Sequence, residues 1–249
     1  MILTSKNNPL IKETAALKEK KARKEYGLFL VEGVKMAKEC QKSGLEIERI
    51  FCTDEALAKE FNQDKTVLVS PDVLRHLSDE KTPQGIVCRV KIPSRKLCKP
   101  AGKCLFLDGV SDPGNMGAII RTANAAGYNE IYVTKECTDS YSPKSVRASM
   151  SGLFFVKIYE GTREEILNVL SDVPLLVADM SGENAFGFSA PSLHALVIGN
   201  EANGISEQVF SAATHTLRIP MRETQESLNA AVSAGILMYL LSKDEFSSK

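Results

Sequence analysis

The sequence predicts an α/β protein in two parts, with a mostly parallel sheet in the second part and a smaller α/β sandwich in the first. Short apolar runs of strand length alternate with helix-like segments along most of the 249 residues. The alternation stops between Ile92 and Lys103, where prolines, a glycine and basic residues gather as in a linker. We therefore predict one domain over residues 1–98 and a second over residues 104–249.

The first part alternates between helical and strand-like segments. Residues 6–25 carry scattered apolar positions among many charges, which predicts an exposed helix. The following GLFLVEG predicts a strand that meets a turn. Further along, helices are predicted at 34–43, 54–62 and 71–77, and strands at 47–52, 66–69 and 84–90.

The second part contains five apolar runs of strand length, KCLFLDGV, EIYVT, FFVKIY, PLLVADM and HALVIGN, separated by helix-like segments. This order predicts a parallel or mostly parallel sheet. Ligands of such sheets bind beyond the carboxyl ends of the strands. The loops DGVSDPGNMG and GNEANGIS follow the first and the last of these runs, so we expect a site where the two loops meet.

The charge of the chain is zero overall but is divided unequally. Residues 1–103 hold 21 Lys and Arg against 14 Asp and Glu, whereas residues 104–249 hold 10 against 17, which gives +7 and −7. A basic part joined to an acidic part indicates that the first part binds a polyanion and that the second part has a different function. A lysine-rich surface that is merely solvated is the alternative.

Several classes of protein are not indicated. The six cysteines form no CxxC pair, and His76, His194 and His215 are isolated, so neither a metal site nor a disulfide framework is expected. No signal-like N-terminal stretch and no run of about 18 apolar residues occurs. We therefore expect a cytoplasmic protein without a membrane anchor.

The glycine-rich loop after the first strand of the second part does not match the common nucleotide motifs. Gly109 and Gly114 have the spacing of a P-loop, but Asn115 and Met116 stand where Lys and Ser or Thr are needed. No GxGxxG fingerprint for a dinucleotide occurs either.

Three segments carry a more specific signal: DPGNMGAIIRTANAAG at 112–127, VIGNEANGIS at 197–206 and IPMRETQESLNAAVSAGI at 219–236. In order and spacing they resemble the three motifs of the SpoU, or TrmH-type, branch of the SPOUT RNA methyltransferases. The resemblance implies a trefoil-knotted α/β domain, a homodimer, and methyl transfer from S-adenosyl-L-methionine to a ribose 2′-hydroxyl. It implies no metal.

Two shorter segments of the first part, VEGVK at 31–35 and TPQGIV at 82–87, resemble marks of the L30e-like substrate-binding domain of larger family members. Because that domain is typical of members that modify ribosomal RNA, the resemblance favours 23S rRNA as substrate. A tRNA substrate and a non-catalytic RNA-binding relative are the alternatives.

The resemblance also implies roles for single residues. Arg121 falls on the arginine described as activating the 2′-hydroxyl. A guanidinium keeps its proton, so we expect Arg121 to stabilise the forming alkoxide and not to act as a base. The remaining implied residues are Asn115, which would orient Arg121 or the ribose, Glu201 in the loop or the subunit interface, Ser227 and Asn229 beside the donor, and Gly199, Ile219 and Leu228 at the cofactor.

Candidate RNA contacts lie in two places. The lysine-rich segment predicted as the first helix contributes five cations, and the segment SPKSVRASMSG resembles a family segment near the RNA, although a surface charge pair is an equal alternative. Together these candidates are Lys18, Lys20, Lys21, Arg23, Lys24, Lys144 and Arg147.

The C-terminal segment 227–241 is apolar around almost its whole circumference and predicts a helix that is buried on nearly all faces. We expect the homodimer to form through this helix.

Overall fold

The structure, a computed structural model, describes residues 2–247 and contains two compact units. Unit 1 comprises the chain up to Ser94 together with Asp139–Phe154, and unit 2 comprises Arg95–Thr138 together with the chain from Phe155 onward. The chain therefore passes from one unit to the other at 94/95, 138/139 and 154/155. None of the helices in this described part of the chain is long and apolar enough to cross a lipid bilayer.

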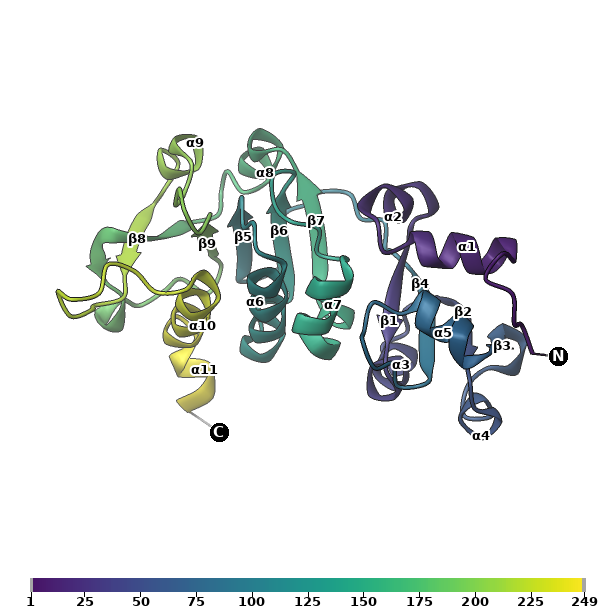
Figure 1. Ribbon diagram of the computed structural model, residues 1–249. Helices are drawn as coiled ribbons and strands as arrows, with labels where there is room; N and C mark the ends of the chain where they lie inside the picture. The colour runs from purple at the N-terminus through teal and green to yellow at the C-terminus, as the bar shows by residue number, and fades with distance from the viewer. Residues whose placement is uncertain (1, 248–249) are drawn as a thin grey trace. The chain divides into compact units, whose positions relative to one another are not determined.

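Unit 1 is built on a four-stranded sheet of order β1-β4-β2-β3, in which β4 is antiparallel to both neighbours and β2 is parallel to β3 (Figure 1). Its core joins apolar side chains of the sheet and of the first and fifth helices. The elements are α1 (Pro9–Ala16), α2 (Lys20–Tyr26), β1 (Leu28–Glu32), α3 (Val34–Lys42), β2 (Ile47–Cys52), α4 (Glu55–Ala58), η1 (Gln63–Lys65), β3 (Thr66–Leu68), α5 (Pro71–Leu77) and β4 (Ile86–Lys91).

The prediction of a single exposed helix over residues 6–25 is wrong, because the structure has two helices, α1 and α2, with a break between them. The break is held by Arg23, whose guanidinium donates to the carbonyl oxygens of Leu17 at 2.8 Å and Lys18 at 2.7 Å. Arg23 also pairs with Asp139 at 2.7 Å and is buried. Arg23 lies within the segment that was predicted to be an exposed helix, but it is a buried residue with a structural role.

The segment Asp139–Phe154 belongs to unit 1 although it lies between two strands of unit 2 in the sequence. It contains α7 (Pro143–Ser149) and η2 (Met150–Phe154), which contact β1 and α3. The ring of Tyr141 lies 5.0 Å from that of Phe29, and Arg147 forms ion pairs with Asp79 and Glu80. The compact units therefore differ from the domains predicted from the sequence in this segment and at residues 95–98, which belong to unit 2.

Unit 2 is built on a six-stranded sheet of order β10-β8-β9-β5-β6-β7, in which every pairing is parallel. The sequence indicated five of these strands and missed β10. The elements are β5 (Cys104–Asp108), α6 (Pro113–Ala126), β6 (Glu130–Thr134), β7 (Lys157–Gly161), α8 (Arg163–Val169), β8 (Leu175–Asn184), η3 (Ala185–Gly187), β9 (Ala195–Gly199), α9 (Glu207–Phe210), β10 (His215–Arg218), α10 (Ala230–Leu240) and α11 (Lys243–Ser247).

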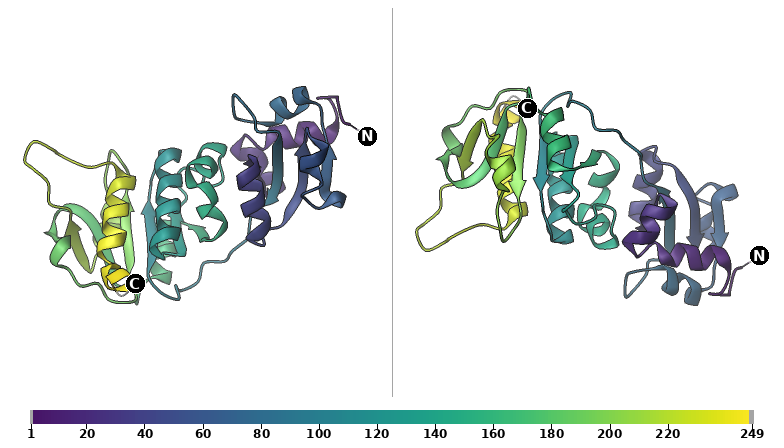
Figure 2. Two further views of the ribbon diagram at one scale, coloured as in Figure 1. Left: turned by 90° about the horizontal axis from the view of Figure 1, so that it is seen from below. Right: turned by 90° about the horizontal axis from the view of Figure 1, so that it is seen from above.

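Two helices frame the place where a ligand is expected. The Asp112 side chain caps α6 by accepting from the Asn115 N–H at 2.8 Å, and α6 ends at Gly127. Asn229 caps α10 in the same way, so the helix begins at Ala230 and not at the predicted Ser227. Helices α6 and α10 pack against each other, as both views of Figure 2 show. The loops that precede both helices therefore lie close together.

Candidate active site

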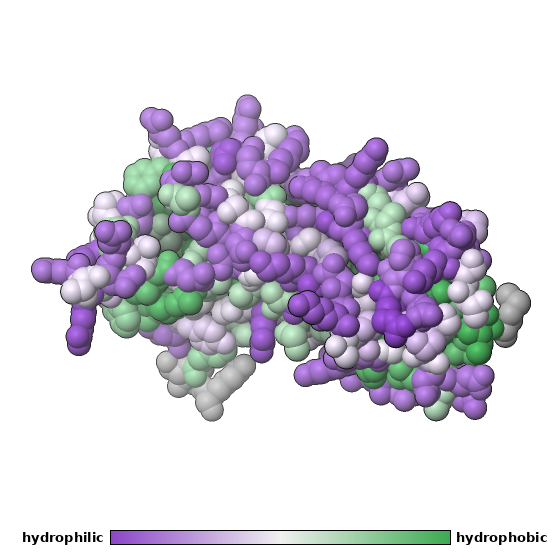
Figure 3. Space-filling view, viewed as in Figure 1, coloured by the Kyte–Doolittle hydropathy of each residue, from purple (hydrophilic) through white to green (hydrophobic). Residues whose placement is uncertain are grey.

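A cavity of about 390 Å³ lies at the carboxyl end of β9 and beside the middle of β8. The carboxyl end of a parallel strand is where such sheets bind ligands. Its volume falls within the range of small-molecule sites. Hydrophobic surface gathers around this part of unit 2 near α10 (Figure 3). Six predicted site residues line the cavity, namely Gly199, Glu201, Ile219, Ser227, Leu228 and Asn229.

The loop after β9 folds back on itself in a tight turn. Asn200 and Gly204 exchange two backbone hydrogen bonds of 2.8 and 2.9 Å. A Cβ on Gly199 would lie only 2.4 Å from the carbonyl carbon of Gly204, so Gly199 cannot carry a side chain in this conformation. Gly204 has a φ of +68°, which also favours glycine. The two glycines therefore bring bare backbone to the wall of the cavity.

Glu201 ties this loop to the loop after β5. Its carboxylate accepts from the Ser111 N–H at 2.9 Å and hydroxyl at 2.7 Å, from the Asp112 N–H at 3.1 Å and from the Asn115 amide at 2.9 Å. Partial burial opposes ionisation of Glu201, but the hydrogen bonds from Asn115 and Ser111 outweigh it and lower its pKa to about 2. Glu201 is thus a fixed anion at any physiological pH.

Asn115 extends this connection to the third motif. The Asn229 side-chain amide donates to the Asn115 side-chain oxygen at 2.9 Å, while the Asn229 oxygen accepts from the N–H groups of Ala231 and Val232. Asn115 therefore stands between Glu201 and Asn229, with both of its side-chain polar atoms engaged. The three motif segments meet through the side chains of these three residues.

Asp108, at the end of β5, is a further part of the site that the sequence did not single out. One of its carboxylate oxygens accepts from the Ser206 N–H at 2.8 Å and hydroxyl at 2.6 Å. The other pairs with Arg163 Nε at 2.6 Å, and the Asp108 side chain is fully buried. The available signal was a carboxylate at the end of an otherwise apolar strand, LFLD, directly before the first motif loop.

Arg121 lies elsewhere on α6. Its side chain is exposed, lines none of the cavity described above, and forms no hydrogen bond or ion pair with any residue from 2 to 247. It follows Asn115 by six residues, which is about 9 Å along a helix. The structure therefore brings Asn115, Glu201, Ser227 and Asn229 together but does not bring Arg121 to the cavity of its own chain.

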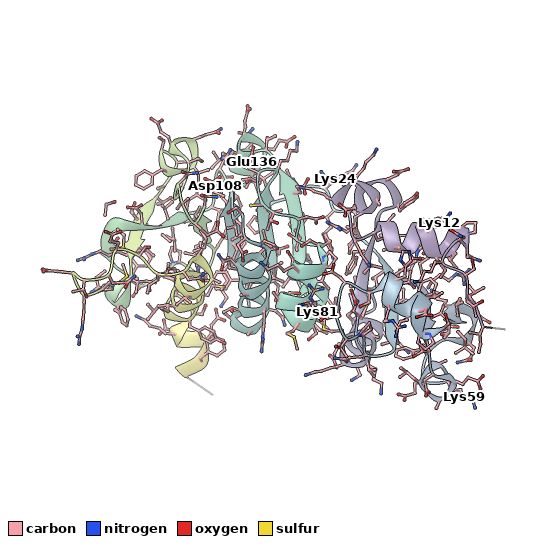
Figure 4. The ribbon with its side chains drawn as sticks, in the orientation of Figure 1. Lys12, Lys24, Lys59, Lys81, Asp108 and Glu136 are labelled. Atoms are coloured by element: carbon pink, nitrogen blue, oxygen red, sulfur yellow. The ribbon has the colours of Figure 1, made fainter. Side chains whose placement is uncertain are left out.

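The candidate RNA contacts differ in accessibility. Arg23 is buried and paired, so it is removed from the set. Lys18 donates to the His76 carbonyl at 2.8 Å, and Arg147 is held by Asp79 and Glu80. The side chains of Lys20, Lys21, Lys24 and Lys144 are exposed, and those of Lys24 and Lys144 also interact with other residues. Figure 4 shows Lys24 on α2.

Within the described part of the chain, acidic and histidine side chains do not gather in the manner of a metal centre. Among residues 2–247, no group of three or more His, Cys, Asp or Glu side chains is arranged to hold a metal ion.

The sequence matches known families over most of its length. Residues 102–239 match the SpoU rRNA Methylase family, and residues 8–88 match the MRM3-like substrate binding domain. The chain belongs to the SpoU rRNA methylase family. All three motif segments of this SpoU protein fall within the first match, and most of unit 1 falls within the second.

Individual relatives of this SpoU protein match along almost its whole length. It is 28% identical to the 23S rRNA (guanosine(2553)-2′-O)-methyltransferase RlmP of Bacillus subtilis, with 96% of this chain and 98% of the relative covered. It is also 28% identical to the 23S rRNA (uridine(2479)-2′-O)-methyltransferase of Streptomyces viridochromogenes, with 95% and 90% covered. These two names specify different bases.

A solved structure agrees with this match. The AdoMet-bound rRNA methyltransferase of Sinorhizobium meliloti is 27% identical, has a TM-score of 0.89, and covers 98% of each chain.

Proposed function

We propose that the protein transfers a methyl group from S-adenosyl-L-methionine to a ribose 2′-hydroxyl of RNA, with 23S rRNA as the substrate. The observation that carries the proposal is the meeting of three distant motif segments at one cavity through Glu201, Asn115 and Asn229. The full-length similarity to rRNA methyltransferases supports the choice of substrate. It also favours the cytoplasm, where ribosomal RNA is found in bacteria.

The cavity suits the cofactor in size and chemistry. Apolar side chains such as Ile198, Leu217 and Leu228 would face the adenine, and backbone groups near Gly199 and Ile219 would hydrogen-bond it. The close approach of backbone at Gly199 leaves room for a ligand where a larger residue would displace the loop. Bound S-adenosylmethionine supplies an electrophilic methyl group and a neutral leaving thioether.

The protein residues then have to align the ribose and stabilise charge. Asn115 and Asn229 hold the rim of the cavity, and Ser227 lies on the same rim beside them. The guanidinium of Arg121 would stabilise the negative charge that develops on the 2′-oxygen while water or a phosphate oxygen takes the proton. Glu201 keeps the loops in place as a permanent anion.

A homodimer completes this proposal. Val232, Tyr239 and Phe246 follow each other at intervals of seven residues along the C-terminal helices and are 50%, 45% and 39% exposed. Such an apolar stripe favours a second copy of the chain as its partner. Because α6 packs against α10, the same interface would carry Arg121 to the cavity of the partner, which explains its distance from its own cavity.

The test is methyl transfer by the full-length protein, with methyl-labelled S-adenosylmethionine and separate preparations of rRNA and tRNA. Label in the 2′-oxygen of 23S rRNA supports the proposal. Label in tRNA alone would favour the tRNA alternative, and binding without label in any RNA would favour a non-catalytic RNA-binding protein.

A further inference from the structure

A second cavity, of about 240 Å³, adjoins the cofactor pocket. It shares Asn200 and Gly204 with that pocket and extends toward the ends of β5 and β6 and the start of α8. Figure 4 shows Asp108 and Glu136 near each other at this edge of the sheet. The cavity is lined by Asp108, Gly109, Ser111, Glu136, Arg163, Asn200, Asn203, Gly204 and Ser206.

The polar groups at the floor of this second cavity already have partners within the protein. Asp108 and Gly109 are buried, and both oxygens of the Asp108 carboxylate are engaged by Ser206 and Arg163. The Asn200 amide donates to the Gly109 carbonyl at 2.8 Å and fixes the opposite wall. Because the polar groups of the floor already have partners, they give the cavity a defined shape. A ligand then has to be recognised by the side chains at the rim.

The rim carries polar groups that are available to a ligand. The Glu136 side chain is 51% exposed, and one of its oxygens lies 3.4 Å from Arg163 Nη1. The Asn203 side-chain amide is exposed and makes no hydrogen bond to another described residue. The cavity is lined by the two carboxylates of Asp108 and Glu136 and by the one guanidinium of Arg163. This excess of negative charge disfavours the binding of a phosphate group. A neutral ligand with donors for Glu136 and acceptors for Arg163 or Asn203 is favoured.

We propose that this cavity binds the base of the target nucleotide and selects guanine. The inference rests on the proposed RNA 2′-O-methylation. A base is joined directly to its ribose, so its site has to adjoin the site of the 2′-hydroxyl. Ser111, which lines the second cavity, donates at 2.7 Å to Glu201, which lines the cofactor pocket and also binds Asn115.

The choice of guanine follows from the pattern of donors. Guanine presents two neighbouring donors, N1–H and the N2 amine, beside the acceptor O6. Adenine, cytosine and uracil each present one donor group on the same edge. The two oxygens of Glu136 accept from both guanine donors, and the neighbouring Arg163 donates to O6. Unstacked bases are recognised in RNA through hydrogen bonds of this kind.

The experiment uses full-length protein and has two arms. In the first, rRNA methylated with labelled S-adenosylmethionine is digested to nucleosides, and we expect the label in 2′-O-methylguanosine. In the second, synthetic RNAs spanning the mapped position carry either guanosine or inosine, which lacks the N2 amine. Both RNAs are given to wild type, to Glu136→Gln and to Glu164→Gln, an exposed carboxylate on α8 outside the cavity.

We expect inosine to lower kcat/KM by about tenfold for wild type and for Glu164→Gln. For Glu136→Gln the guanosine RNA becomes a poorer substrate and the penalty for inosine falls to about twofold or less, because the second acceptor is gone. Label in another 2′-O-methylnucleoside, or a full tenfold penalty in Glu136→Gln, would overturn the inference. Absence of label from every RNA would instead count against the proposed function.

Discussion

The side-chain amide of Asn115 donates to the carboxylate of Glu201 at 2.9 Å and joins two segments that are 86 residues apart in the sequence. Glu201 receives three further hydrogen bonds from Ser111 and Asp112, and Asn115 passes the connection on to Asn229. One carboxylate therefore determines how the loops around the cavity are placed.

Glu201→Gln is expected to weaken binding of S-adenosylhomocysteine about tenfold, because the glutamine nitrogen cannot accept the hydrogen bonds that one carboxylate oxygen receives. Titration calorimetry measures the affinity. Glu207→Gln, an exposed carboxylate of α9 outside the cavity, is the matched control and should bind as wild type. Equal affinity in wild type and Glu201→Gln would contradict the role given to this network.

The same residue predicts a pH dependence. With a folded pKa of about 2 against a usual 4.5, Glu201 contributes stability that is fully present above pH 4.5 and is lost as the pH falls toward 2. Cofactor affinity should therefore show no titration of Glu201 between about pH 5 and 8. If the cofactor affinity of wild type changed stepwise with pH in that range and the step were absent in Glu201→Gln, the carboxylate could not be permanently charged.

Arg121→Ala is expected to lower kcat by about 100-fold or more while leaving the affinity for S-adenosylhomocysteine unchanged, since the group acts on charge that develops during the reaction. Arg121→Lys should also be poor, because an ammonium does not reproduce the guanidinium fork. Lys135→Ala, an exposed cation of unit 2 outside the cavity, serves as the control. Near-normal turnover of Arg121→Ala would exclude the assigned role.

Mixing two inactive variants tests whether Arg121 serves the partner subunit. Gly199→Val should abolish cofactor binding, because a Cβ at this position meets the Gly204 backbone at 2.4 Å. If Arg121 acts across the interface, co-refolded Arg121→Ala and Gly199→Val chains form mixed dimers with one intact site, and activity returns. If both groups serve the same chain, every mixed dimer stays inactive.

A Tyr239→Asp variant that remains dimeric by light scattering would argue against an interface formed by the C-terminal helices.

The exposed lysines at the start of α2 predict a salt dependence of RNA binding. Replacing Lys20 and Lys21 together with glutamine should lower the slope of log affinity against log salt by about 0.7 to 0.9 for each lost phosphate contact. Lys59→Gln, on a different part of unit 1, is the control. An unchanged slope in the double variant would mean that these lysines form only a solvated face.

His194 predicts how stability responds to acid. Burial lowers its pKa below the usual 6.5, with a smaller contribution from Lys103, and its ring nitrogens contact the Tyr128 hydroxyl at 2.8 Å and the Pro191 carbonyl at 2.6 Å. The unfolded chain therefore binds a proton that the folded chain does not, and stability falls as the pH drops below 6.5. The loss of Tm should reach up to about 5 °C per pH unit.

Thermal unfolding between pH 7 and 5 measures this effect. At pH 7 the His194→Gln variant should have a lower Tm than wild type, but its Tm should change less between pH 7 and 5. The Tm of His215→Gln, a variant of an exposed histidine, should follow that of wild type. A profile of His194→Gln as steep as that of wild type would refute the assignment.

Much of the fold could be predicted from the sequence because its signals are local. The strand at residues 47–52 and the helix at 71–77 coincide with β2 and α5, since apolar periodicity and a Ser-Pro helix start mark their ends. The strand β10 was missed because HTLR is short and half polar. The trefoil knot implied by the resemblance stays a prediction.

What could not be predicted depends on contacts between distant residues. Asp108 reaches Arg163 and Ser206 across 55 and 98 residues, and Arg23 reaches Asp139 across 116. No local pattern distinguishes Arg23 from its exposed neighbours Lys20 and Lys24, so its burial is visible only in the structure. The motif residues were found because the three segments that contain them resemble, in order and spacing, those of a known family.

The most direct test of the proposed 2′-O-methylation is the position of the methyl group that the full-length protein adds to RNA. Purified protein is incubated with unmodified 23S rRNA and methyl-labelled S-adenosylmethionine, and the digested nucleosides are separated and identified. We expect label on a ribose 2′-oxygen in wild type and its loss in Arg121→Ala. Label on a base, or an undiminished ribose signal in Arg121→Ala, would contradict this expectation.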